Sequence, residues 1–542
     1  MSQSVEPARE TKSQKAERLK REKNPWHGLE EIRRFAREGH GSIPDDWKGT
    51  YFKWWGLYSQ GNGQGAFGDA AVYFMLRIGL PNGIATSEQL RATGRLAKRF
   101  ARNQAAITVR QSLQFHWVEI ESVPDIIESL EGVGLTCKGT SGDSLRGVTG
   151  CPLSGCLDDE LLDTRPLVRQ IAKELAANAD FYNLPRKIKV AVSGCPSWCS
   201  HPEINDLGLT AVRNGEHLGY SIRVGGGLSR QPHFGVKLNA FVRQEQAAGV
   251  VRAVMELFRR QDVLREKRES ARLKYLFLKH GWTGERFLGE LEEILGYKLA
   301  PAVAEDVPGA GAREHLGVHP QKQRGRYAIG IPVPGGVLTG DQLIEIARLV
   351  ELYAGGEVRF SVGQNMLIPH VPEQFREAFA RELEGIGLSP EVSSFRTAVV
   401  SCTGKEFCKM GIAETKGFSR RLIGEMERRM PGFSSGLSIH VTGCSHGCAH
   451  HHVSDIGLEG RKLRKGSDAV DGFAFRLGGS LGDRAMLGRA VGYQCATDDV
   501  PEAIERLLRG YMERRLPGEA LRSFLQRSNN ETLCSLLAGV AQ

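Results

Sequence analysis

The chain has 542 residues, a length that corresponds to about three or four domains of ordinary size. Lys and Arg number 72 against 63 Asp and Glu, which gives a net charge of +9, and hydrophobic residues make up 41%. This composition is typical of a soluble globular protein, and no segment is apolar for long enough to predict a membrane span. Residues 1–23 lack an apolar stretch, so they predict a flexible or frayed cytoplasmic leader and exclude a signal peptide.

The first predicted strand covers residues 72–80, where apolar side chains alternate with others and Arg77 lies on the opposite face. A Pro/Gly turn follows, and Thr86 with Gln89 forms a capping box that opens a helix. A second strand is predicted over residues 107–115, with Arg110 on its polar face, and a further helix over residues 123–130. Together these elements predict a small βαβα unit that resembles half of a ferredoxin-like sheet.

This unit occurs twice. The sequence around Pro81, Thr86 and Gln89 returns around Pro334 at a constant offset, which persists through Gln111 and Gln364 to the ends of both units. The later parts of the two halves also correspond, including their cysteine loops. The chain therefore predicts an α+β (mixed α/β) fold, internally duplicated with pseudo-two-fold symmetry, in which ferredoxin-like repeat units pair into a central domain beside two larger α/β lobes.

Eleven cysteines are too few for a secreted disulfide framework in a chain of this length. Eight of them form four close pairs, namely Cys151 with Cys156, Cys195 with Cys199, Cys402 with Cys408, and Cys444 with Cys448. Paired thiols on two loops can converge on zinc or on an iron–sulfur cluster, or they can be unreactive buried thiols. The longer spacings in the second half favour a cluster there.

Lys187 and Lys189 lie two residues apart on a predicted strand and therefore share one face, opposite Ile188 and Val190. Such a pair is commonly a solvated stripe, and Arg77 and Arg110 opposite their apolar stripes allow the same interpretation. The alternative is a pocket for an anion, because a buried anion needs several cations around it.

Two segments carry a family resemblance: Ser401-Cys-Thr-Gly-Lys-Glu-Phe-Cys408 and Thr442-Gly-Cys-Ser-His-Gly-Cys448. They resemble the cluster signature of the sirohaem-dependent nitrite and sulfite reductases. Supporting motifs extend the resemblance over about residues 45 to 515, including the segments that contain Arg77, Lys187 and Lys189.

The resemblance implies cofactors and roles for individual residues. Cys402, Cys408, Cys444 and Cys448 are expected to hold a [4Fe–4S] cluster, and Cys448 also to bridge to the sirohaem iron. The residues expected to bind and protonate the anionic substrate are Arg77, Arg146, Lys187 and Lys189. Arg110 and Arg186 are expected to bind the cofactor.

The resemblance and the repeat together predict domain boundaries: an N-terminal extension (1–62), ferredoxin-like repeat 1 (63–138), an anion- and sirohaem-binding lobe (139–300), a linker (301–319), ferredoxin-like repeat 2 (320–390), and a cluster and sirohaem lobe with C-terminal helices (391–542).

The implied reaction is the six-electron reduction of nitrite to ammonia by an assimilatory, cytoplasmic enzyme. We expect a monomer that takes electrons from ferredoxin or a similar small acidic protein and binds neither nucleic acid nor membranes. The alternative is sulfite reduction to sulfide with the same cofactors, favoured by Lys189, because a second ammonium suits a dianion. Some sulfite-reducing members have a cysteine near the position of Ser144 that crosslinks to a tyrosine at the position of Tyr58, and Ser144 cannot form this crosslink. Remoter alternatives are a zinc or nucleic-acid-binding protein and a cobalamin-pathway oxygenase.

The first-half cysteines depart from the family pattern, because Cys151, Cys156, Cys195 and Cys199 fall at positions equivalent to the cluster ligands. They predict either a second metal or cluster site or a set of reduced structural thiols.

Overall fold

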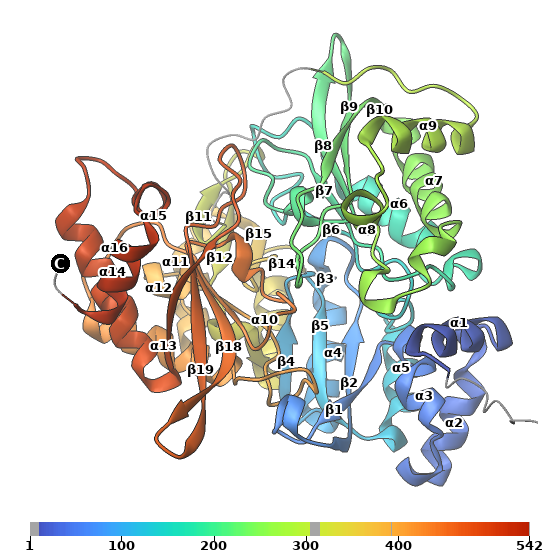
Figure 1. Cartoon of the computed structure of the whole chain (residues 1–542), viewed down its shortest axis with the longest axis horizontal. Helices are drawn as coiled ribbons and strands as arrows, with labels where there is room; N and C mark the ends of the chain where they lie inside the picture. Colours follow the sequence, from blue (N-terminus) through green and yellow to red (C-terminus); the bar gives the residue numbers. More distant parts are fainter. Residues whose placement is uncertain (1–9, 304–314, 392, 541–542) are drawn as a thin grey trace, which may run out of the picture.

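The computed structural model describes residues 10–303, 315–391 and 393–540, and it places two lobes against a central domain (Figure 1). Four five-stranded sheets organise the chain, two in the central domain and one in each lobe. This arrangement confirms the predicted mixed α and β fold with an internal duplication. Within the described residues no helix is long and apolar enough to cross a membrane.

The first sheet of the central domain is antiparallel. In spatial order its strands are β1 (Leu57–Gly61), β2 (Ala70–Ile78), β5 (Leu113–Val118), β4 (Gln104–Ile107) and β13 (Val337–Thr339). The second sheet has the same order of equivalent strands: β11 (Gly317–Pro320), β12 (Arg326–Ile331), β15 (Met366–Pro372), β14 (Glu357–Phe360) and β3 (Ile84–Thr86). The two repeats thus exchange an edge strand, since β13 completes the first sheet and β3 completes the second.

Four helices cover these sheets: α4 (Ser87–Phe100), α5 (Val123–Glu131), α10 (Gly340–Tyr353) and α11 (Arg376–Gly385). The predicted capping box is confirmed, since the Thr86 side chain accepts a hydrogen bond from Gln89 N and the Gln89 side chain accepts one from Thr86 N. Helices α4 and α10 cross closely at Gly94 and Gly340, where a Cβ on either glycine would lie within 2.7 Å of the other's carbonyl oxygen. The two glycines allow the repeats to pack helix to helix.

The predicted strand over residues 107–115 is wrong. The chain instead forms a hairpin, in which β4 ends at Ile107, a turn occupies residues 108–112, and β5 begins at Leu113. The Thr108 hydroxyl accepts hydrogen bonds from Arg110 N and Ser112 N, and Gln111 adopts a left-handed conformation with φ 56°. The turn places Arg110 at the tip of the hairpin, outside both strands.

The two lobes have matching sheets. The first comprises β6 (Thr149–Gly150), β7 (Val190–Ser193), β8 (Leu207–Asn214), β9 (His217–Val224) and β10 (Val236–Arg243), and the second β16 (Val399–Ser401), β17 (Ile439–Thr442), β18 (Ile456–Lys465), β19 (Asp468–Leu477) and β20 (Arg489–Ala496). In each sheet the first three strands are parallel and the others antiparallel. Equivalent loops therefore leave the same sheet edge in both lobes.

Helices flank each lobe. The first lobe has α6 (Arg165–Leu175), α7 (Ala247–Arg259), α8 (Tyr275–Lys279) and α9 (Gly284–Leu295), and the second α12 (Ser394–Ala398), α13 (Lys416–Arg429), α14 (Val500–Arg514), α15 (Leu521–Arg527) and α16 (Asn530–Ala538). Each lobe has its own hydrophobic core, separate from that of the central domain.

The N-terminal segment is structured, so the prediction of a flexible or frayed leader is wrong for residues 12–22. These residues form α1 (Lys12–Glu22), which opens with a capping box and is followed by α2 (Leu29–Glu38) and α3 (Asp45–Gly49). The Lys20 ammonium is buried and donates to Leu184 O at 2.9 Å, which fixes α1 to the first lobe. Residues 1–9 of the predicted leader lie outside the described part of the chain.

Candidate redox and anion site

The second-half cysteines lie on loops at the carboxyl ends of parallel strands. Cys402 directly follows β16, and Cys444 comes two residues after the end of β17. Backbone N–H groups point at the sulfurs, because Gly443 N donates to Cys402 Sγ at 3.2 Å and Met410 N donates to Cys408 Sγ at 3.4 Å. Such hydrogen bonds stabilise thiolates and are one of the features that set the potential of an iron–sulfur cluster.

The four second-half thiols face a common space. Burial raises the pKa of Cys444 to about 12, and the negative charges of the other three cysteines contribute to that rise. Among the described residues, no three of these four sulfurs lie within 4.8 Å of one another, so the set is open and not compact. Cys448 is the exposed member.

The central domain holds the cysteine loops in place. His116 of β5 stacks on Phe407, between Cys402 and Cys408, with ring centroids 3.9 Å apart, and Gly61 N of β1 donates to Phe407 O at 2.9 Å. Burial lowers the pKa of His116 to about 3, so this ring is neutral. The first repeat therefore packs directly on the cysteine loop of the second lobe.

Two equivalent glutamines connect the repeats to both lobes. The Gln364 side chain donates to Ser401 O and accepts from Ser401 N, the residue before Cys402, at 2.9 and 2.8 Å. The Gln111 side chain makes the same pair of bonds, both at 3.0 Å, with Gly150, the residue before Cys151. Each glutamine thereby fixes the strand end from which a cysteine loop begins.

A group of cations, Arg77, Arg146, Lys187 and Lys189, lies near Cys448 and is called the cationic pocket below. The thiolate charge of Cys448 contributes to the pKa of both Arg77 and Lys187, which places these cations near its sulfur. Arg77 and Arg146 share an acceptor, Thr140 O, at 3.2 and 3.3 Å. Burial lowers the pKa of Arg77 to about 10.

Tyr58 lies in the same pocket, with its hydroxyl 3.4 Å from Arg146 Nη2. Burial alone would raise its pKa, but the positive charges of Arg146 and Arg77 outweigh burial and lower the pKa to about 7. Sequence reasoning considered Tyr58 only as a crosslink position. The Ser144 hydroxyl donates to Ser141 O at 2.8 Å, so in this structure that residue is part of a buried turn.

Lys187 and Lys189 precede β7, which begins at Val190, so their placement within that strand is wrong. Their shared face is confirmed, because Ile188 and Val190 are fully buried while both lysines are half-buried. Within the described residues neither ammonium has an acidic partner. Burial and then neighbouring cations, Arg146 beside Lys187 and Lys187 beside Lys189, hold both pKa values well below the usual range.

Arg110 and Arg186, the predicted cofactor ligands, already have protein partners. Arg110 donates to Asn205 Oδ1 at 2.6 Å and to Val190 O at 3.0 Å. Arg186 lies 3.3 Å from the buried carboxylate of Asp143. Although burial would raise the pKa of Asp143, its surrounding cations hold it well below the usual range.

Sequence reasoning did not assign Arg272 and Asp206, a largely buried ion pair that holds the backbone at Lys189. Arg272 binds the Asp206 carboxylate in bidentate fashion, at 2.9 and 2.7 Å, and Lys189 N donates to the same carboxylate at 2.8 Å. The only signal was that both residues fall within family-like segments. The pairing itself joins positions far apart in the chain.

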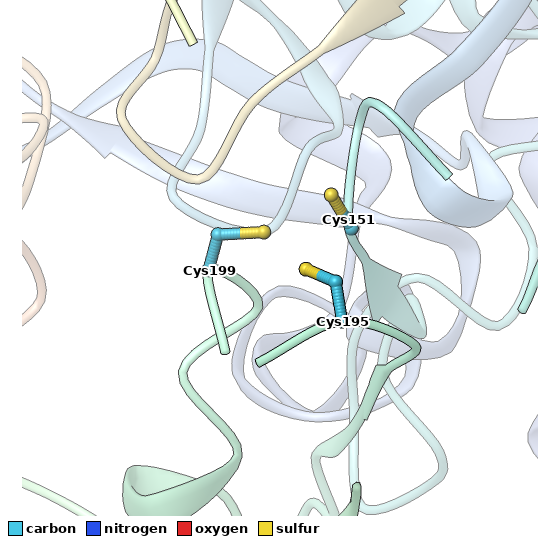
Figure 2. Close-up of side chains that lie close together, drawn as sticks. All are labelled: Cys151, Cys195 and Cys199. Carbon is cyan, nitrogen blue, oxygen red and sulfur yellow. The ribbon is translucent and has the colours of Figure 1, made fainter. Parts of the chain in front are cut away.

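Three of the four first-half cysteines, Cys151, Cys195 and Cys199, lie together and are called the cysteine triad, whereas Cys156 lies apart from them. The ligand atoms of Cys151, Cys195 and Cys199 all lie within 4.8 Å of one another, and their sulfurs point toward a common centre (Figure 2). Cys156 is not part of this group. Its thiol lies near the guanidinium groups of Arg359 and Arg165, which partly offset the rise in pKa that burial causes.

The donor set of the pocket fits a polyanionic cofactor and a small anion. In the described part of the chain, six buried guanidinium nitrogens have no hydrogen-bond partner, and three of them, the Nε atoms of Arg77, Arg110 and Arg146, belong to the cations of this site. A buried N–H group without an acceptor is costly unless a bound group accepts from it, and an anion is the acceptor that suits a guanidinium. The fold and the site thus define a class of protein: an internally duplicated α+β protein in which a set of four cysteines lies next to a group of cations that can bind an anion.

Comparisons with known proteins identify the family. The family model described as nitrite and sulphite reductase 4Fe-4S domain matches residues 141–299 and 393–537, and the nitrite/sulfite reductase ferredoxin-like half domain matches residues 68–133 and 319–386. The chain belongs to the nitrite and sulphite reductase family. It is therefore an oxidoreductase, and its cofactors are the [4Fe–4S] cluster and the sirohaem that the family carries.

Individual relatives cover nearly the whole chain. The assimilatory ferredoxin-dependent nitrite reductase of Haloferax mediterranei is 33% identical, with 92% of this chain and 89% of that protein covered. Sulfite reductase [ferredoxin] 1 of Mycolicibacterium paratuberculosis is 35% identical, with 92% of each covered. The solved structure of Mycobacterium tuberculosis NirA protein matches with a TM-score of 0.91 at 32% identity, covering 96% of this chain and 97% of that one.

Proposed function

We propose that the protein reduces nitrite to ammonia with electrons from ferredoxin. The observation that carries this proposal is the cationic pocket beside Cys448, in which neither Lys187 nor Lys189 has an acidic partner among the residues that the structure describes. Relatives named ferredoxin-dependent nitrite reductases support both the substrate and the donor. That the enzyme is a monomer and that it acts in the cytoplasm both remain predictions.

In this proposal Cys402, Cys408, Cys444 and Cys448 would hold the cluster, and Cys448 would also be the residue that links it to the sirohaem. The open spacing of their sulfurs suits a cubane, in which each thiolate binds a different iron. When bound, the sirohaem supplies the iron that binds the anion and passes electrons to it. Arg186 and the unpartnered Nε of Arg110 contribute positive charge toward its carboxylates.

The chain's own cations bind the substrate and deliver protons. Arg77 and Arg146 are held at one acceptor, Thr140 O, and present fixed positive charge to the anion. Lys187 and Lys189 are the proton donors, because an ammonium with a lowered pKa gives up its proton more readily near neutral pH. Each departing nitrite oxygen must leave as water, so such donors are required.

Sulfite is the second candidate substrate, and Lys189 is the residue that favours it. A second ammonium next to Lys187 stabilises a dianion more than a monoanion. The relatives do not separate the candidates, since nitrite and sulfite reductases match at 33% to 35% identity.

Steady-state assays with both anions test the proposal. Electrochemically reduced methyl viologen or ferredoxin should supply the electrons, because dithionite releases sulfite as it is oxidised. We expect a higher kcat/KM for nitrite, with ammonia as product, and a higher kcat/KM for sulfite would reverse the assignment. The Lys189→Asn variant should shift the ratio further toward nitrite, and an unchanged ratio would remove Lys189 as the discriminating residue.

A further inference from the structure

The cysteine triad of the first lobe, Cys151, Cys195 and Cys199, has no part in the proposed reaction. Cys151 follows the end of β6, and the other two lie on the loop after β7. All three side chains are buried, with at most 5% of their surface exposed. Two loops distant in sequence thus bring three sulfurs together, as Figure 2 shows.

A fourth donor lies beside this triad. His315 Nε2 is 3.8 Å from Cys151 Sγ. The backbone of His315 crosses β12 at Gly330, where a Cβ would lie 1.8 Å from His315 O, so only glycine at this position lets the histidine segment approach. The protein therefore brings a nitrogen donor, from the segment that precedes β11, to Cys151 at the edge of the triad, and binding an ion would draw His315 closer to the other two sulfurs.

We propose that Cys151, Cys195, Cys199 and His315 form a mononuclear zinc site. Three thiolates and one imidazole are a common ligand set for structural zinc, which is tetrahedral with Zn–S near 2.3 Å. That geometry requires sulfurs roughly 3.8 Å apart, in agreement with a group whose atoms all lie within 4.8 Å. The thiolates of a [4Fe–4S] cluster bind separate irons and stand roughly 6 Å apart, which the triad does not allow.

The surroundings of the triad suit a structural ion. Leu153, Leu157, Ala328 and Leu367 pack around the cysteines and make their surroundings apolar. A pocket of about 170 Å³ borders Cys199 and His315 and is also lined by His201, His440 and His450, which offers a path for the ion to enter. A closed four-ligand site without an open position stabilises a fold and does not catalyse.

Zinc at this position would join the first lobe to the segment that leads into the second repeat. Lys189 directly precedes β7, and the loop that carries Cys195 and Cys199 directly follows that strand. Fixing the carboxyl end of so short a strand would help to hold the segment at its amino end, which presents the substrate-binding lysines. The proposal is independent of which anion is reduced.

The test measures zinc and iron in the purified holoenzyme after dialysis against a weak chelator. We expect about one zinc per chain, in addition to the iron of one cluster and one sirohaem. Zinc-edge X-ray absorption, which the sirohaem does not obscure, should show about three sulfur ligands and one nitrogen. No zinc, or iron and sulfide in excess of one cluster, would overturn the proposal, as would a disulfide among the three cysteines detected by mass spectrometry.

Substitutions of single residues test which side chains bind the zinc. Cys151→Ser, Cys195→Ser and Cys199→Ser should each lose the zinc, whereas Cys156→Ser is the matched control and should retain it. His315→Ala should lower zinc affinity at least tenfold in a chelator competition, and an unchanged affinity would overturn the four-ligand site. If a serine variant does not fold, titrating the wild-type thiols with a mercurial answers the same question, because zinc release must accompany the reaction of three thiols.

Discussion

The two lobes place cysteines at equivalent ends of equivalent strands, yet the sulfurs are arranged differently. In the second lobe the four thiols are spread apart and Cys448 is exposed, whereas in the first lobe three thiols are compact and buried. The distance between the sulfurs decides what the loops can bind: the spread set of the second lobe suits a cluster, and the compact set of the first lobe suits a single ion. A duplicated scaffold thus preserves the position of the thiols, while small changes in loop length change their chemistry.

The anion pocket shows the complementary difference. The first lobe contributes Arg146, Lys187 and Lys189, and the second lobe contributes Cys448 to the same space. In the proposed function, one half therefore supplies cations and the other supplies the thiolate that binds the cofactors. Function at this site depends on the asymmetry that the two halves acquired after duplication.

The largest expected effect comes from removing a second-half ligand. Cys444→Ser should abolish the cluster and lower kcat for nitrite more than about 100-fold, because electrons no longer reach the anion. Iron and sulfide counts together with electron paramagnetic resonance of the reduced protein measure the loss. Cys534→Ser, a helix cysteine outside both sets, is the control. A Cys444→Ser protein with a full complement of cluster iron would remove Cys444 from the ligand set.

The next effect concerns the cations of the first lobe. Lys187→Ala should lower kcat/KM about 100-fold, since it removes an ammonium placed to protonate the anion. Lys187→Arg should restore binding of nitrite but not the rate, because guanidinium donates its proton poorly. Steady-state kinetics at several pH values separate the effect on nitrite binding, seen in KM, from the effect on proton delivery, seen in kcat. Equal kcat values in the alanine variant and the wild type would exclude Lys187 as a donor.

Sequence patterns predicted the repeated elements well where the signal was local. The capping boxes at Thr86 and Thr339 are both present, because N-cap chemistry depends on four consecutive residues. The hairpin over residues 108–112 was missed, since its turn contains neither glycine nor proline. Gln111 adopts its left-handed conformation while its side chain binds Gly150 and Phe360, both distant in sequence.

In the candidate site too, sequence patterns did not predict the contacts between residues distant in the chain. Family-like motifs predicted the cations of the pocket, and the structure brings Arg77, Arg146 and Lys187 together. Motifs could not predict that His315 would approach Cys151 or that Cys156 would turn toward Arg359. Loop spacing in sequence does not determine which sulfurs converge, because that depends on how the repeats pack.

A third prediction compares two equivalent aspartates. Asp206 accepts from Lys189 N and binds Arg272, while Asp455 accepts from Ser438 N and binds Arg522. Asp206→Asn should cost about 3 kcal/mol of unfolding free energy, because it leaves a buried guanidinium uncompensated. Asp455→Asn should cost about 1 kcal/mol, since Arg522 is 37% exposed against 13% for Arg272. Denaturant unfolding of both variants measures the difference, and equal losses would contradict the ranking.

The smallest expected effect is a pH dependence at Tyr58. Because Arg146 and Arg77 lower its pKa to about 7, the phenol is neutral below that pH and becomes a phenolate above it. The phenolate offsets the positive charge that binds the substrate, so KM for nitrite should rise about threefold between pH 6 and 8. Nitrite is the substrate to use, since its charge is constant over this range whereas that of sulfite is not. Tyr58→Phe should make KM independent of pH, and Tyr73→Phe on strand β2 should behave like the wild type. A KM that still rises in Tyr58→Phe would assign the titration to another group, with Lys187 and Lys189 as the next residues to test, because loss of their protons has the same sign.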